Sequence, residues 1–243
     1  MYTMIEDIIL TNHHYLFYII GSIVFHWTYY IFHELMMKSG SVYNTLHYNK
    51  QKYIASNFLK SVMLAGITPA AGYVMYDGMV NDNWNNNLIR NLGILYSIPD
   101  TVSLFVVKKM DLTTKVHHSV VCLFNIVSIR NDYTQENVVR CMLVYACFSA
   151  FAFIVNFNLA VRFLHENKKI ENMLSRAAFL IYSSCCFLNW SWHLKELSTQ
   201  WNGCDEYYCI RAIPTYTLFI IMIVVDDIKL INWLFYKSGY LTY

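Results

Sequence analysis

The sequence predicts an all-α, polytopic membrane protein with about seven transmembrane helices. Its 243 residues are 56% hydrophobic and only 14% charged, whereas soluble proteins average about 25% charged residues. Several apolar runs reach the ~20 residues that a helix needs to cross a hydrocarbon core of about 30 Å, and backbone hydrogen bonding favours helices for such spans. The formal charge of +2 is too small to indicate a nucleic-acid partner.

The expected spans follow the apolar runs in order. They cover approximately residues 15–32, 53–75, 88–107, a histidine-bearing run ending near 129, 138–164, 173–192 and 212–235. Acidic Glu6 and Asp7 precede the first run and no small-residue cleavage site follows it, so we interpret it as a retained helix. In the third, Pro99 is expected to kink the helix beside Asp100. We divide the chain into residues 1–52, an N-terminal helix and cytosolic loop, and residues 53–237.

Lysines near the span ends predict the orientation. They gather in loops one, three and five: Lys38, Lys50, Lys52, Lys108, Lys109, Lys115, Lys168 and Lys169. The positive-inside rule then places the N-terminus on the lumenal side and the C-terminus in the cytosol. Cys204 and Cys209 fall in a polar loop on the oxidising side, where a disulfide and two free thiols both remain open.

With this orientation, the polar residues of different spans fall at one depth, at about 1.5 Å per residue. The group comprises His117, His118, Asp100, Asp226, Asp227, Asn156, Asn57 and Lys60. Charged groups in lipid are costly and mark functional sites, so we predict a cavity open to the cytosol. The alternative is that Asp100, Asp226 and Lys60 pair structurally in a bundle core.

The adjacent imidazoles His117 and His118 are the centre of this prediction. With a nearby carboxylate, they suit acyl transfer in which one nitrogen attacks or deprotonates and the carboxylate orients the ring. Asp100 is the expected carboxylate. The histidine spacings of membrane di-iron enzymes are absent from the sequence, so no metal site and no bound cofactor are expected. The alternative is that both rings are interfacial, wetted by headgroups.

The run Tyr96-Ser-Ile-Pro-Asp100, followed by His117-His118 and later by Asn156-Phe-Asn-Leu-Ala-Val-Arg162, resembles the TLC-domain superfamily of ceramide synthases and translocating-chain-associating membrane proteins. The resemblance covers roughly residues 53–235. It implies a six-helix, barrel-like bundle with one extra N-terminal helix, an endoplasmic-reticulum-type membrane and a lipid cavity. In the synthases it implies transfer of an acyl chain from acyl-CoA to a sphingoid amine.

The sequence departs from the synthases at the aspartate pair that follows their histidines. The corresponding positions lie close to Tyr145 and Phe148, and the acidic residue that other members carry near Ser149 is also missing. A synthase would therefore need Asp100, Asp226 or Asp227 as its carboxylate.

Two functions follow from these residues. In the first, His117, His118 and Asp100 catalyse N-acyl transfer, the remaining polar group binds substrate, and acyl-CoA is the co-substrate. Lys108, Lys109 and Lys115 would then attract coenzyme A phosphates, although positive-inside bias also explains them. In the second, the protein is a non-catalytic relative that binds lipid or regulates membrane composition. Membrane lipid is the expected partner in both, and a homodimer is left open.

Overall fold

The structure is a computed structural model that describes residues 2–39, 42–165, 167–203 and 208–239, with side chains from residue 13 onward except that of residue 208. Every regular element in these residues is a helix. The elements are α1 (Tyr2–Lys38), α2 (Val42–Thr45), α3 (Tyr48–Asn81), α4 (Asn86–Val106), α5 (Leu112–Arg130), α6 (Val139–Phe151), α7 (Phe153–Val161), α8 (Lys168–Gly203), the π-helical turn η1 (Tyr208–Ala212) and α9 (Ile213–Lys237).

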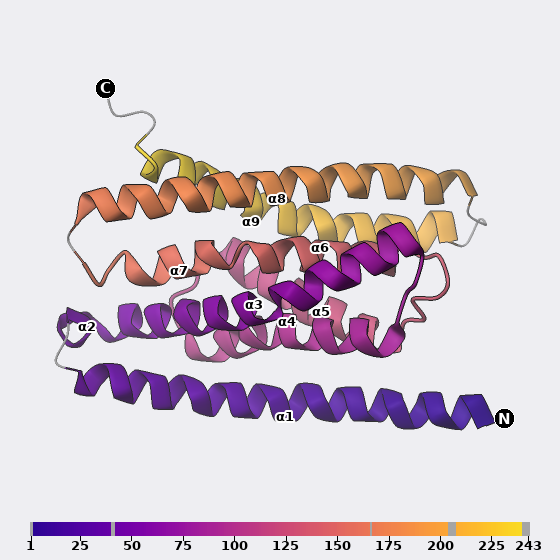
Figure 1. Ribbon diagram of the computed structural model, residues 1–243, viewed down its shortest axis with the longest axis horizontal. Helices are drawn as coiled ribbons and strands as arrows, with labels where there is room; N and C mark the ends of the chain where they lie inside the picture. Colours follow the sequence, from indigo (N-terminus) through magenta and orange to yellow (C-terminus); the bar gives the residue numbers. More distant parts are fainter. Residues whose placement is uncertain (1, 40–41, 166, 204–207, 240–243) are drawn as a thin grey trace.

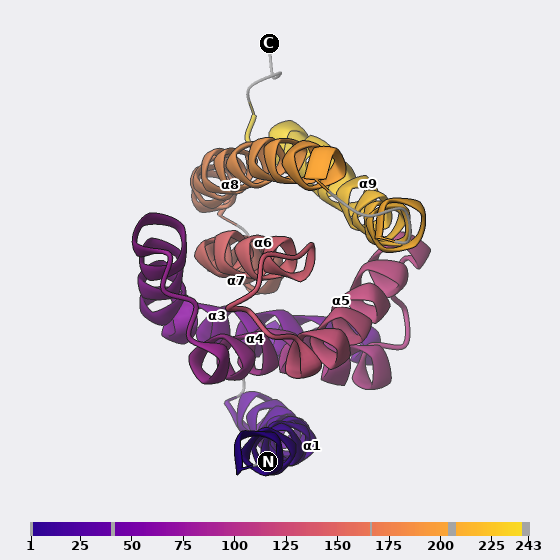
Figure 2. The ribbon, with the colours of Figure 1, turned by 90° about the vertical axis from the view of Figure 1, so that its right-hand side faces the viewer.

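Helices α3 to α9 form a closed ring of packed neighbours. α3 packs on α4, α4 on α5, α5 on α9, α9 on α8, and α8 on α6 and α7, which return to α3. Figure 2 shows α6 and α7 between the layer of α3, α4 and α5 and the layer of α8 and α9. α1 lies outside this ring and packs mainly on α4 (Figures 1 and 2).

Within the described residues, three helices are long and apolar enough to cross a membrane, and a fourth span exists if α6 and α7 are counted together. The three are His13–Lys38 of α1, α3 and α5. The remaining expected spans are helical but more polar. α4 carries Arg90 and Asp100, α8 begins with two lysines, and α9 contains Asp226, Asp227 and Lys229. Three of the seven expected spans therefore satisfy composition and length, or four if α6 and α7 are one span.

The expected span at residues 138–164 is broken in two. α6 and α7 meet at Ala152 with a bend of 46°. Side chains of α3 bond to the backbone on both sides of the break, because Thr68 Oγ1 lies 3.0 Å from the carbonyl oxygen of Ala150 and Ser61 Oγ donates to that of Phe153 at 3.0 Å. Hydroxyls that satisfy freed carbonyls permit such a bend. α4, by contrast, continues as a helix through Pro99.

The largest apolar core lies around the α3–α4 turn. Trp84 in this turn packs against Gly78, where an added Cβ would lie only 3.1 Å from the indole ring. Trp84 Nε1 donates to Asp82 Oδ1 at 2.7 Å, and Asp82 has the left-handed backbone that ends α3. The surrounding core includes Leu64, Ile67, Val74, Ile89, Leu92, Tyr133, Leu143 and Cys147. The indole ring of Trp84 therefore occupies the space beside Gly78 at this end of the bundle.

Candidate functional site

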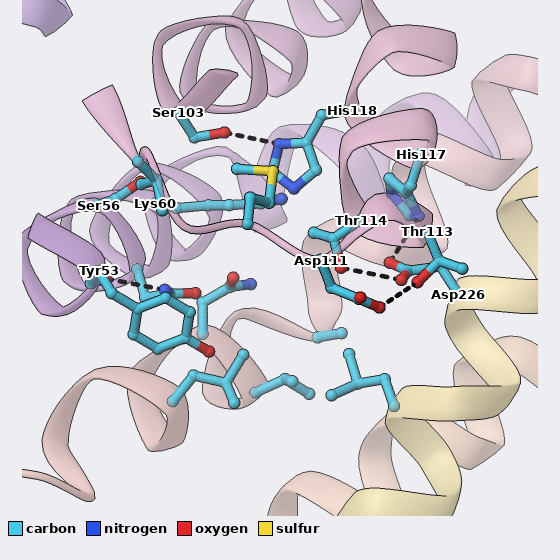
Figure 3. Close-up of a pocket in the computed structure, with 18 of the residues that line it drawn as sticks. Tyr53, Ser56, Lys60, Ser103, Asp111, Thr113, Thr114, His117, His118 and Asp226 are labelled. Carbon is cyan, nitrogen blue, oxygen red and sulfur yellow. Dashed lines mark hydrogen bonds and ion pairs between the residues drawn. The ribbon is translucent and has the colours of Figure 1, made fainter. Parts of the chain in front are cut away.

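A cavity of about 360 Å³ lies at the end of the bundle where α3 and α5 begin and α4, α7 and α9 end. Its volume falls within the ~300–1,000 Å³ typical of small-molecule sites. Apolar side chains alternate with polar ones on its walls. The polar lining includes Ser56, Asn57, Lys60, Ser103, Lys109, Asp111, Thr114, His117, His118, Asn156, Arg162, Asp226 and Lys229. Figure 3 shows the histidines and their partners.

His118 is fixed against the last turns of α4. Its Nδ1 lies 2.6 Å from Ser103 Oγ and 3.2 Å from Asp100 Oδ1 (Figure 3 marks the first contact). Ser103 Oγ already donates its hydrogen to the carbonyl of Asp100 at 2.7 Å, so it accepts a hydrogen from His118 Nδ1. A neutral imidazole carries one N–H. The lone pair of His118 therefore lies on Nε2.

Asp100 is fully buried and forms an ion pair with Lys60 of α3. A buried carboxylate needs such compensation, because removing one partner leaves an unpaired charge in a medium of low dielectric constant. Lys60 also lines the cavity. The cavity and the structural pairing that the sequence left as alternatives are therefore both present around Asp100.

His117 faces the opposite neighbour, α9. Its Nδ1 lies 3.4 Å from Asp226 Oδ2, which is within ion-pair distance but lacks hydrogen-bond geometry. Asp226 Oδ1 accepts a hydrogen bond from Thr114 Oγ1 at 3.0 Å (Figure 3). The two imidazole centroids are 5.7 Å apart. Consecutive helical residues point about 100° apart, so each histidine has a carboxylate from a different helix.

Asp227 lies behind the cavity wall. It is 1% exposed and accepts hydrogen bonds from Tyr145 at 2.6 Å and from Tyr182 at 2.7 Å, and both tyrosines line the cavity. Tyr145 lies on α6, which carries no carboxylate of its own. Asp227 of α9 therefore places a carboxylate beside Tyr145 of α6.

An ion pair between Asp111 and Lys229 joins the start of α5 to α9 at the rim of the cavity. Asp111 precedes α5 and accepts hydrogen bonds from Thr113 Oγ1 at 2.8 Å and from Lys229 Nζ at 3.2 Å. Both hydrogen bonds lower the pKa of the Asp111 carboxyl below its usual value, and the one from Thr113 contributes most. The bridge holds α9 beside the first turn of α5.

The structure places most of the expected residues together. His117, His118, Asp226, Asn156, Asn57 and Lys60 line the cavity, while Asp100 and Asp227 contact residues that line it. Of the three lysines expected near its mouth, Lys109 lines the cavity, whereas Lys108 and Lys115 do not. Cys209 is disulfide-bonded, and Cys204 lies outside the described residues.

Sequence reasoning assigned no role to Ser103, Tyr182, Arg162 or Trp233, all of which line the cavity. A guanidinium inside the apolar run at residues 138–164 was the available signal for Arg162. Trp233 follows Lys229 by one helical turn, so the two share a face of α9.

No three His, Cys, Asp or Glu side chains among the described residues are grouped closely enough to hold a metal ion. Comparisons of the chain with protein-family models, with curated proteins and with solved structures find no match.

Proposed function

We propose that this chain is a multi-pass membrane protein that binds lipid in the cavity and transfers an acyl group there. The observation that carries the proposal is His118, whose Nδ1 is held by Ser103 and Asp100 on the wall of a cavity. This is the arrangement of an oriented general base, in which a carboxylate fixes the ring and stabilises its charged form.

The reaction would join an acyl-CoA to an amine of a lipid. His118 Nε2 takes a proton from the amine nitrogen while that nitrogen forms a bond to the acyl carbonyl carbon. The carbon–sulfur bond then breaks, and the imidazolium returns the proton to the departing thiolate. Asp100 stabilises the transient positive charge on His118. Tyr145 and Tyr182 direct their hydroxyl hydrogens at Asp227, which leaves them as wall residues.

The resemblance to the TLC-domain superfamily is part of this proposal. Support comes from the closed ring formed by α3, α4, α5, α9, α8 and α6 with α7, and from α1 outside it. We propose that all seven apolar segments span an endoplasmic-reticulum-type membrane, with the cavity end facing the cytosol. A reporter fused to the C-terminus should then be cytosolic, and a lumenal signal would contradict this orientation.

A non-catalytic lipid-binding protein is the second candidate. The observation that favours it is the ion pair between Asp100 and Lys60, because a carboxylate already neutralised by an ammonium stabilises an imidazolium less strongly. In that case the cavity would bind or sense lipid without chemistry.

Lipid profiling separates the two candidates. Cells expressing the wild type, His117→Ala/His118→Ala and the control His13→Ala are compared, since His13 is exposed on α1 away from the cavity. Acyl transfer predicts a change in ceramides or other acyl lipids that persists in the control and vanishes in the double variant. Identical profiles for the wild type and the double variant would rule out the enzyme.

A further inference from the structure

We propose that Arg162 forms a phosphate-binding site in the wall of the cavity and that the bound molecule is an amphiphile with a phosphate at its polar end. The inference rests on the proposed function in one respect, that the cavity receives a substrate. It adds the chemical class of the group that Arg162 would recognise.

Arg162 immediately follows α7 and is enclosed by aromatic rings from three parts of the chain. Its guanidinium carbon lies 4.4 Å from the ring centroid of Trp233, 4.6 Å from that of Phe163 and 5.6 Å from that of Tyr53. Rings at such distances attract a cation and favour a stacked guanidinium plane. The rings stabilise the position of the guanidinium. The N–H groups at the edge of its plane remain for other hydrogen-bond partners.

Among the described residues, the charge of Arg162 has no partner carboxylate. No described Asp or Glu lies within ion-pair distance of it, and Glu171 of the nearby α8 pairs instead with Lys237 at 3.7 Å. Two other cations of the cavity are compensated, because Lys60 pairs with Asp100 and Lys229 with Asp111. Arg162 is therefore a cation of the lining that is left for an external anion.

The hydrogen-bond donors of Arg162 are also largely unused. Its one hydrogen bond to a described residue runs from an Nη to the hydroxyl of Tyr53 at 3.4 Å, and no described residue accepts a hydrogen from its buried Nε. A guanidinium has five N–H donors in a planar fork that matches phosphate oxygens in pairs. The amides of Asn57 and Asn156 line the same cavity and add neutral donors.

The rest of the lining indicates an amphiphile rather than a small ion. Apolar side chains share the cavity with Arg162, namely Leu64, Val155, Leu159, Leu230 and Trp233. A free phosphate would leave these side chains without apolar contacts, whereas a phospholipid or a coenzyme A thioester would bring both a phosphate and a hydrocarbon chain. The shared chemistry is the phosphate, and the experiment distinguishes its source.

A purely structural explanation exists for the position of Arg162. A cation after the last turn of a helix interacts favourably with the helix dipole, and aromatic neighbours can anchor it. That explanation requires a charge at this site but no anion in the cavity. Lys50 provides a matched control, because its Nζ lies 5.3 Å from the centroid of the same Phe163 ring while the side chain is outside the cavity lining.

The test measures dissociation constants of the full chain purified in detergent micelles for three probes: dioleoyl phosphatidic acid, coenzyme A and dioleoylglycerol. Arg162→Met should weaken binding of at least one phosphate-bearing probe by about 10- to 100-fold, as expected for loss of charge-assisted hydrogen bonds. Dioleoylglycerol, which has no phosphate, should change by less than about threefold. Lys50→Met should bind all three probes as the wild type does.

Arg162→Lys guards against a folding artefact, because it keeps the charge and loses only the planar fork. Its binding of the affected probe should fall between those of the wild type and Arg162→Met. A loss confined to phosphatidic acid identifies a lipid headgroup, and one confined to coenzyme A identifies the soluble co-substrate. Unchanged affinity of Arg162→Met for both phosphate probes, or equal weakening of all three probes, would overturn the inference.

A fourth variant separates this inference from the proposed reaction. His118→Ala should keep its affinity for the phosphate probe and lose acyl transfer. If His118→Ala still transfers acyl groups, the proposed reaction fails while a binding defect of Arg162→Met still supports the phosphate site. If Arg162→Met binds normally while His118→Ala is inactive, the phosphate site fails and the reaction remains.

Discussion

The two adjacent histidines of α5 meet walls of the cavity that are built differently. His118 lies against a buried network in which Ser103 and Asp100 hold one ring nitrogen and Lys60 compensates the carboxylate. His117 lies 3.4 Å from Asp226, whose side chain remains 15% exposed, and makes no hydrogen bond through Nδ1. Adjacent identical residues on a helix therefore need not share a role. His118 is oriented by a hydrogen bond to Ser103 and an ion pair with Asp100, whereas His117 has only the ion pair with Asp226.

Single histidine substitutions give the sharpest test of this difference and the largest expected effect. His118→Ala should lower acyl transfer by about 10²- to 10⁴-fold, the range for an oriented general base. His117→Ala should lower it by about tenfold, since His117 is paired with Asp226 only through charge and lacks the hydrogen bond that orients His118. The measurement is product formation in membranes supplied with labelled acyl-CoA and a sphingoid amine. A larger loss in His117→Ala would reverse the assignment of roles.

The second test measures the stability of the network that holds His118, which consists of Ser103, Asp100 and Lys60. Lys60→Met leaves Asp100 as a buried carboxylate without its ammonium partner, and the expected destabilisation is about 3–5 kcal/mol. Thermal or denaturant unfolding in detergent would measure it. Asp226→Asn beside His117 should lower the free energy of unfolding by less than about 1 kcal/mol, because that carboxylate is partly exposed and its ion pair with His117 is long.

A paired substitution checks the cause of that destabilisation. Lys60→Met/Asp100→Leu removes both charges, and replacing a buried ion pair with apolar side chains is often neutral. The double variant should therefore be more stable than Lys60→Met alone. If the two variants are equally unstable, packing of the Lys60 side chain rather than charge compensation stabilises this wall.

The smallest expected effect lies at the rim beside His117. Because the pKa of Asp111 is lowered in the folded protein, its bridge stabilises the fold above the ordinary carboxyl range and the contribution disappears as the pH falls through the lowered pKa. Asp111→Asn should therefore unfold at a slightly lower temperature than the wild type at pH 7. The gap should begin to narrow near pH 4, the ordinary range of a carboxyl, and close as the pH falls through the lowered pKa of Asp111. Lys229→Met should reproduce the neutral-pH loss, and a gap that persists in acid would contradict the bridge.

Several features of the fold could be predicted from hydropathy and polar spacing. The helical class, the position of each apolar segment and the beginning of α5 just before His117 and His118 follow from the run lengths and from Asp111 before the helix. The break at Ala152 could not be predicted, because it depends on hydroxyls of Thr68 and Ser61 from another helix. The charged side chains of α4, α8 and α9 keep these helices from meeting the composition expected of a span, so seven membrane spans remain a proposal.

That polar residues of separate helices would gather near one end of the bundle could be predicted from the amino-acid order, because the rise of a helix converts residue number into position along its axis. Which of these side chains meet depends on how the helices pack. This packing pairs His118 with Asp100, His117 with Asp226 and Arg162 with three aromatic rings. The reason is that the rotation of each helix about its axis is set by packing against its neighbours, and no periodicity within one helix specifies that rotation.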